Sequence, residues 1–139
     1  MELKRIPPDE ALELMEDEGF SYVDVRSQPE FEAGHPEGAY NVPWKVSGPG
    51  GMASNPDFLA VMEKTFAKDA KLIVGCQAGG RSKAAATALL EAGFTQIVDQ
   101  LAGFGGARDS FGQTIEAGWQ AQGLPVSIES DGRGYDDLK

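Results

Sequence analysis

The stretch Lys71–Ser82, which reads KLIVGCQAGGRS, carries the clearest indication of the fold. Residues 71–75 form a short apolar run of the kind found in a buried parallel strand. Ser82 begins an alanine-rich segment with helical spacing, which ends at Gly93, a common C-terminal stop for a helix. The stretch therefore predicts a strand, a tight loop around Cys76 and a helix in direct succession.

Strands and helices alternate on both sides of this stretch. The expected order is a helix from Pro8 to Gly19, a strand over 20–25, a short helix over 29–33, a turn over 34–38, a short strand over 39–42, a surface loop over 47–51, a helix capped by Asn55 and begun by Pro56, the strand and helix of 71–93, a strand over 96–99, and a last helix through Phe111, Ile115 and Trp119 to Gly123. This alternation predicts an α/β fold with a parallel sheet covered by helices on both faces.

The length of the chain fits one domain. Its 139 residues are 41% hydrophobic, which is enough apolar material for a single core. We find no internal repeat and no second domain. We expect the domain to span residues 1–126 and residues 127–139 to form an acidic, flexible C-terminal tail.

The charge of the chain excludes several classes of partner. A formal net charge of -10 opposes binding to nucleic acid or to anionic lipid, because both depend on a basic surface. No uncharged apolar run approaches the roughly 18 to 20 residues of a membrane helix, and acidic residues stand where a signal peptide would be apolar. We therefore expect a cytoplasmic protein with neither nucleic acid nor membrane as a partner.

The chain holds one cysteine, Cys76, and one histidine, His35. A single cysteine excludes an intrachain disulfide, a CxxC redox pair and a cysteine-rich metal cluster. A zinc site would need several carboxylates at a spacing that is not found. We expect no metal and no other cofactor, so the chemistry of the protein should centre on one thiol.

The loop at Cys76 has the features of an anion site. Ligands bind outside the carboxyl ends of parallel strands, and Cys76 lies where the strand 71–75 should end. Gly79 and Gly80 permit a tight, concave loop whose amides turn inward, and Arg81 and the following helix N-terminus favour negative charge. A lone cysteine after an apolar strand is more often an inert buried side chain, but such a residue needs no loop of this kind. The pattern favours a nucleophilic thiolate.

Three parts of the sequence resemble the single-domain rhodanese family. They are CQAGGRS at 76–82; residues 21–26 followed by Glu30, Phe31, Gly34 and His35; and Gly105, Gly106 and Trp119 with GLPV at 123–126. The segment GMASNPDFL at 51–59 is also similar to an insert in plant senescence-associated rhodaneses and their bacterial relatives. The resemblance implies a rhodanese-like, five-stranded parallel sheet flanked by helices on both faces.

The resemblance also implies a reaction. Cys76 would take the outer sulfur of thiosulfate or of a persulfide, and would pass it to cyanide or to a thiol such as glutathione or thioredoxin, by double displacement. By the same resemblance the substrate-binding residues are Gln77, Ala78, Gly79, Gly80, Arg81 and Ser82. Arg26 is a further substrate-binding candidate, although Asp24 and Arg26 more simply brace the fold.

Two positions depart from the family pattern. Pro36 follows the Gly-His pair where the family usually has an apolar residue, and Gln77 stands where arginine is common. The second change leaves one fewer cation for a dianionic donor, so thiosulfate is expected to be a poor natural donor. His35 is interpreted as a structural residue of its turn rather than a base. Trp44 is interpreted first as a packing residue that could also line the pocket.

Two other functions remain open at this stage. A cysteine phosphatase or arsenate reductase would have five residues between its cysteine and arginine, whereas four separate Cys76 from Arg81. The chain also lacks the second thiol that many arsenate reductases need. The other alternative is a non-catalytic persulfide carrier or redox-sensing interaction module, which would have the same sequence features.

Overall fold

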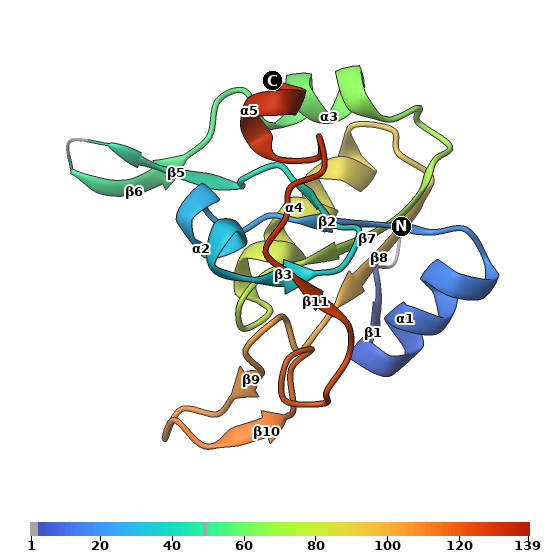
Figure 1. The fold of residues 1–139 in the computed structure, drawn as a ribbon. Coiled ribbons are helices and arrows are strands. Elements are labelled where there is room, and N and C mark those ends of the chain that lie inside the picture. The colour runs from blue at the N-terminus through green and yellow to red at the C-terminus, as the bar shows by residue number, and fades with distance from the viewer. Residues whose placement is uncertain (1–2, 49) are drawn as a thin grey trace.

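Five parallel strands form the centre of the protein, a computed structural model that describes residues 3–48 and 50–139 (Figure 1). In spatial order the strands are β1 (Lys4–Ile6), β8 (Gln96–Gln100), β7 (Lys71–Gly75), β2 (Ser21–Asp24) and β4 (Tyr40–Asn41). Every neighbouring pair runs parallel. The predicted five-stranded parallel sheet is therefore confirmed, with β7 and its following cysteine in the middle position.

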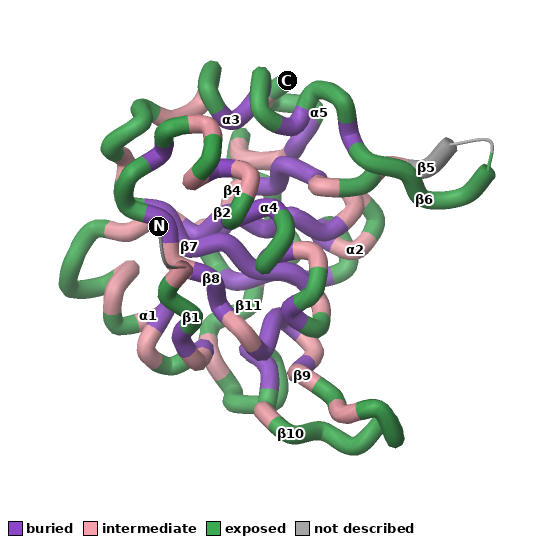
Figure 2. Tube along the Cα trace, turned by 180° about the vertical axis from the view of Figure 1, so that it is seen from behind, coloured by how far each residue is buried: buried purple, intermediate pink, exposed green. Residues whose placement is uncertain are grey.

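Helices cover both faces of this sheet, as predicted. On one face α3 (Phe58–Thr65) and α4 (Gly80–Glu91) pack over Leu72 and Val74. On the other face α1 (Pro8–Asp17) and α2 (Gln28–Ala33) pack over Ile73. Since strand side chains alternate between faces, burial on both sides explains why β7 is a continuous apolar run (Figure 2). In the described ranges no helix is long and apolar enough to cross a membrane.

The prediction of a last helix through Phe111, Ile115 and Trp119 is wrong. Its sequence forms a two-stranded antiparallel hairpin, β9 (Ala107–Arg108) with β10 (Thr114–Glu116), at the lower end of Figure 1. Phe111 and Ile115 are 88% and 65% exposed, and only Trp119 is buried. The four-residue spacing of large apolar residues imitates a helical face, but two of these three side chains never reach the core.

The surface loop expected over 47–51 is also wrong. It belongs to a second antiparallel hairpin, β5 (Lys45–Gly48) with β6 (Gly51–Ser54), which projects from the body in Figure 1. Pro49 lies outside the described residues. A half-buried strand is recognised by alternating apolar and polar residues. Residues 51–54 of β6 are all exposed, so their sequence has no such alternation.

Two helix starts differ from the prediction by two residues. The third helix begins at Phe58, because Asn55 uses its side chain to accept a hydrogen bond from the Asp57 amide in the turn before the helix. The helix after the cysteine begins at Gly80 rather than at Ser82. The N-terminus of α4 is therefore closer in sequence to Cys76 than expected.

The C-terminal segment packs onto the domain. Strand β11 (Val126–Ser127) pairs with β3 (His35–Pro36), and the chain ends in α5 (Tyr135–Leu138). Tyr135 is buried in the same core cluster as Cys76, and its hydroxyl accepts a hydrogen bond from Asn55 at 3.0 Å. Tyr135 thus belongs to the core of the domain. The domain boundary at 126 and the flexibility of residues 127–139 stay predictions.

Candidate active site

Cys76 begins the segment that we call the cysteine loop, residues 76–82. Its side chain is 2% exposed, and its Sγ accepts a hydrogen bond from the Gly79 amide at 3.1 Å. Gly79 has a φ of +101°, and a Cβ there would lie 2.3 Å from the Leu101 carbonyl oxygen, so only glycine fits. Gly79 is also the N-cap of α4. An amide and a helix N-terminus therefore both favour negative charge at the sulfur.

A second loop, residues 101–106, supports the cysteine loop from the end of β8. The Phe104 amide donates to the Cys76 carbonyl oxygen at 2.7 Å, and the Gly105 amide donates to that of Gln77 at 2.9 Å. A Cβ on Gly103 would lie 2.5 Å from the Gln77 carbonyl oxygen. These contacts fix the first two carbonyl groups of the cysteine loop against the second loop, which holds its shape before any substrate arrives.

Gln100 organises the supporting loop. It is fully buried, and its Oε1 accepts from the amides of Ala102 and Gly103 at 2.8 and 2.9 Å. Its Nε2 donates to the Gly103 carbonyl at 2.9 Å and to the Tyr22 hydroxyl at 3.2 Å. Burial, followed by the charge of Asp24, raises the pKa of Tyr22, so that hydroxyl stays neutral. Gln100 was not predicted, because a single polar residue at the end of a strand gives no indication of its hydrogen-bond partners.

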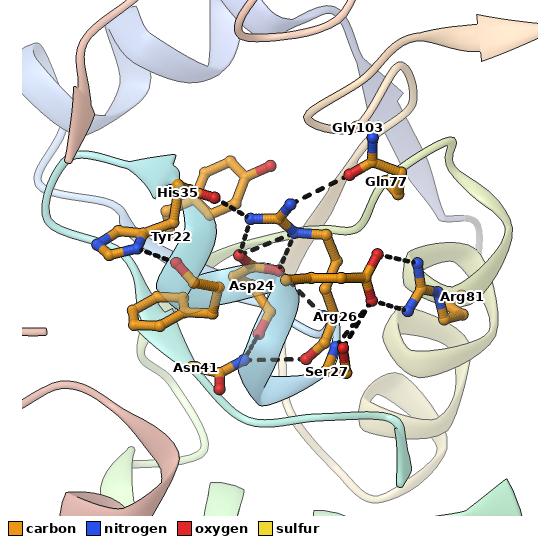
Figure 3. A network of polar contacts seen from close by, with 12 residues as sticks. Tyr22, Asp24, Arg26, Ser27, His35, Asn41, Gln77, Arg81 and Gly103 are labelled. Atoms are coloured by element: carbon orange, nitrogen blue, oxygen red, sulfur yellow. Dashed lines mark hydrogen bonds and ion pairs between the residues drawn. The ribbon is translucent and has the colours of Figure 1, made fainter. Parts of the chain in front are cut away.

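Arg26 is a buried cation at the centre of the polar network in Figure 3. It pairs with Asp24 (Nη2 to Oδ2, 2.7 Å) and donates to the Gly34 carbonyl at 2.6 Å and to Gln77 Oε1 at 3.1 Å. Its guanidinium also lies 4.5 Å from the centroid of the Phe104 ring. Arg26 therefore ties the end of β2 to the cysteine loop. Its predicted contact with substrate would compete with these bonds.

Arg81 is paired with a carboxylate of α2. Its Nη1 and Nη2 lie 2.7 and 3.0 Å from the two carboxylate oxygens of Glu30 (Figure 3 draws the pair). Glu30 also caps α2 by accepting from the amide and hydroxyl of Ser27. Hydrogen bonds from Arg81, with those from Ser27, lower the pKa of Glu30 to about 2 against the opposing effect of burial. The Ser-x-x-Glu spacing signals the cap, but nothing in the sequence signals the ion pair.

A third arginine, Arg5 of β1, reaches the cysteine loop from the opposite side. It pairs with Asp99 (Nε to Oδ2, 2.6 Å) and donates to the Gly79 carbonyl at 3.1 Å. Burial raises the pKa of Asp99, although the hydrogen bond and the charge of Arg5 oppose this effect. Ser82 is itself buried and donates to the Gly79 carbonyl at 3.3 Å. Arg5 and Asp99 were not predicted, since they are 94 residues apart in sequence.

His35 lies in a structural position. It is 1% exposed and stacks on Phe31 with ring centroids 3.7 Å apart. Its ring nitrogens lie 2.7 Å from the Phe31 carbonyl oxygen and 2.9 Å from that of Glu129.

Trp44 packs edge-to-face on Phe58 against the core cluster that contains Cys76. Within residues 3–48 and 50–139, no group of three or more His, Cys, Asp or Glu side chains could hold a metal ion.

Two open clefts flank the cysteine loop. One, of about 440 Å³, is lined by Gln77 together with Arg26, Glu30 and Phe104. The other, of about 420 Å³, is lined by residues 78–80 on the side that faces Arg5 and Lys83. The loop residues that line these clefts are neighbours of Cys76, whose own side chain is buried.

These features define an α/β domain with a cysteine held at the carboxyl end of the central strand of a parallel sheet. The family model for the rhodanese-like domain matches residues 7–105, and the chain belongs to this family. The matched range includes the cysteine loop and the loop that supports it. The family predicted from the sequence is thereby confirmed.

Named relatives agree with this assignment. The chain is 39% identical over 128 residues to thiosulfate sulfurtransferase 16 of Arabidopsis thaliana, covering 90% of this chain and 97% of that protein. It is 43% identical over 86 residues to the senescence-associated protein DIN1 of Raphanus sativus, covering 62% of this chain but only 47% of that protein. The crystal structure of Rv0390 from M. tuberculosis matches with a TM-score of 0.75 at 31% identity, covering 93% of this chain and all of that one.

Proposed function

We propose that the protein is a sulfurtransferase that moves a sulfane sulfur from thiosulfate or a persulfide to a thiophilic acceptor through a persulfide on Cys76. The observation that carries this proposal is the hydrogen bond from the Gly79 amide to Cys76 Sγ at the N-terminus of α4. One relative, thiosulfate sulfurtransferase 16, matches this chain over nearly the whole length of both proteins, and its name supports the same reaction class.

The reaction proceeds in two displacements. The Cys76 thiolate attacks the outer sulfur of thiosulfate, the bond between the two sulfurs breaks, and sulfite leaves with the electron pair. The product is an anionic persulfide on Cys76, whose charge the loop amide and the helix N-terminus stabilise. A thiolate or cyanide then attacks the outer sulfur, and the Cys76 thiolate is the leaving group.

The acceptor is a second molecule. The sequence contains one cysteine, so no other thiol of the chain can remove the sulfur from Cys76. Glutathione, thioredoxin, another protein thiol and cyanide are the acceptors that this chemistry allows.

Transfer of sulfur is favoured over transfer of a phosphoryl group. Four residues separate Cys76 from Arg81, which makes the loop one residue shorter than the phosphatase pattern. The Arg81 guanidinium is also occupied by both oxygens of Glu30. A phosphoryl dianion would need that guanidinium for its own oxygens.

Intact mass spectrometry tests the covalent step. After incubation with thiosulfate and removal of excess donor, we expect the protein to gain one sulfur, about 32 Da, and Cys76→Ser to gain none. Addition of cyanide should return the original mass and release thiocyanate. A mass gain of the same size in Cys76→Ser, or equal rates of sulfite release by the two proteins, would refute the proposal. Loading without turnover would instead identify a persulfide carrier.

A further inference from the structure

In the part of the chain that the structure describes, three arginines contact the cysteine loop or belong to it, and each is paired with a carboxylate. The pairs are Arg26 with Asp24, Arg81 with Glu30, and Arg5 with Asp99. Each pair sums to zero formal charge while its carboxylate is ionised. Lys83 also lies near the loop, and it is exposed on the side of the Arg5 cleft, where water screens its charge.

Arg81 is the arginine that belongs to the cysteine loop itself. The hydrogen bonds that Arg81 donates to Glu30 raise the pKa of Arg81, and the charges of Glu30 and Cys76 add to that effect. Arg81 is therefore electrostatically coupled to the reacting sulfur, but both of its terminal nitrogens already face Glu30. An incoming anion at the loop meets a neutral pair instead of a free guanidinium.

Glu30 is fixed in this position by more than Arg81. Its Oε1 accepts from the Ser27 amide at 3.1 Å and from the Ser27 hydroxyl at 2.9 Å. The carboxylate therefore cannot swing away to release Arg81 without also breaking the cap of α2. The neutralisation of Arg81 is built into the fold.

We propose that the cysteine loop selects a sulfane-sulfur donor with a single negative charge, an organic persulfide or thiosulfonate, over the thiosulfate dianion, and that Glu30 is the positioning residue that imposes this preference through Arg81. This inference rests on the proposed sulfurtransferase function. Amide donors and a helix N-terminus supply the equivalent of a partial positive charge, which suits one negative charge better than two.

The transfer from such a donor balances without a further reactant. The Cys76 thiolate attacks the outer sulfur of R–S–S⁻, the bond between the two sulfurs breaks, and R–S⁻ leaves with the electron pair. With a thiosulfonate, R–SO2–S⁻, the leaving group is the sulfinate R–SO2⁻. In both cases Cys76 ends as the same anionic persulfide.

Thiosulfate and methanethiosulfonate form a matched pair of probes. The second replaces one oxygen anion of thiosulfate by a methyl group and so carries one charge less. We expect the wild-type protein to favour methanethiosulfonate by about tenfold in kcat/KM beyond the preference of a small free thiol such as N-acetylcysteine. Dividing each kcat/KM by the rate constant of the free thiol with the same donor removes the intrinsic difference in reactivity between the two leaving groups. Hydroxyethyl persulfide, assayed in parallel, distinguishes a persulfide donor from a thiosulfonate.

Glu30→Gln tests the role of the carboxylate. The amide oxygen can still accept hydrogen bonds from Arg81 and Ser27, but the charge of Arg81 is no longer cancelled. Since Coulomb energy scales with charge, we expect KM to fall about tenfold for thiosulfate and about threefold for methanethiosulfonate. Glu32→Gln removes the same charge from an exposed position of α2 and should leave both values unchanged. Glu30→Asp should restore the wild-type preference.

The outcomes separate this inference from the proposed function. If neither donor loads sulfur onto Cys76, the sulfurtransferase proposal fails. If both donors load, but wild-type protein shows no preference beyond that of the free thiol, selection by charge is refuted. Suppose that the preference exists and that Glu30→Gln folds. If its ratio of kcat/KM between the two donors then equals that of Glu32→Gln, the role of Glu30 is refuted. The wild-type comparison with the free thiol decides the charge preference even if Glu30→Gln does not fold.

Discussion

The cysteine loop, after β7, and the β9–β10 hairpin, soon after β8, begin at the same edge of the sheet but are held in different ways. The backbone of the cysteine loop is anchored by residues distant in sequence, through Phe104, Gly105 and Arg5. The hairpin is held by its own backbone, as in the bond from the Asp109 amide to the Gln113 carbonyl, and its largest side chain points to solvent. The loop that carries Cys76 is thus held by long-range contacts, and the exposed hairpin by local ones.

A methyl group on Gly103 should disturb the supported loop most. Its Cβ would lie 2.5 and 2.6 Å from the carbonyl oxygens of Gln77 and Cys76, at a φ of +68°. We expect Gly103→Ala to lower the free energy of unfolding by about 3 kcal/mol or more and to reduce kcat. Urea unfolding and steady-state assays measure both. Gly112→Ala, at a φ of +81° with open space around it, should cost only about 1 kcal/mol. Equal losses would show that the two loops do not differ.

Replacing Gln100 should have the next largest effect. Gln100→Leu keeps a similar volume but removes the acceptor of two buried amides and the donor to the Gly103 carbonyl and the Tyr22 hydroxyl. We expect a loss of about 2 to 3 kcal/mol in the free energy of unfolding, together with slower sulfur loading of Cys76. Gln113→Leu, on the exposed hairpin, is the control and should stay within about 0.5 kcal/mol of wild type. A stable, fully active Gln100→Leu protein would contradict the bracing role.

The ion pair between Glu30 and Arg81 should contribute less. Both side chains are partly exposed, so we expect Glu30→Gln to lose about 1 kcal/mol or less at pH 7. The folded pKa of Glu30, about 2, lies below its ordinary value of 4.5, so its stabilisation is complete above pH 4.5 and is lost as pH falls toward 2. Unfolding of wild type and variant by urea from pH 7 to pH 3 should therefore show a difference that shrinks only below about pH 4.5. A difference that grows on acidification would have the wrong sign.

The smallest effect is expected at the tip of the hairpin. Phe111 is 88% exposed, so Phe111→Ser should change the free energy of unfolding by less than about 0.5 kcal/mol. Sulfur loading from thiosulfate should also stay at the wild-type rate, because the side chain buries almost no area. Thermal unfolding and the mass assay measure the two quantities. A loss above about 1 kcal/mol would mean that the hairpin contributes to the core.

Much of the fold was predictable because its signals are local. The buried run 71–75, the glycines after Cys76 and the helix that follows are consecutive in sequence, and burial of a strand on both faces leaves an uninterrupted apolar pattern. The predictions failed where side chains do not face the core. Phe111 and Ile115 have helical spacing by chance, and β6 lacks the alternation that burial would impose.

The sequence by itself determined the sheet, the position of Cys76 and the length of the loop between Cys76 and Arg81. Only the tertiary structure decided what the arginines do. Glu30 lies 51 residues from Arg81, and Asp99 lies 94 residues from Arg5. Hydrogen bonds and ion pairs depend on distance in space, and no spacing along the chain encodes such partners. The charge that a donor meets at Cys76 is for this reason a property of the folded protein.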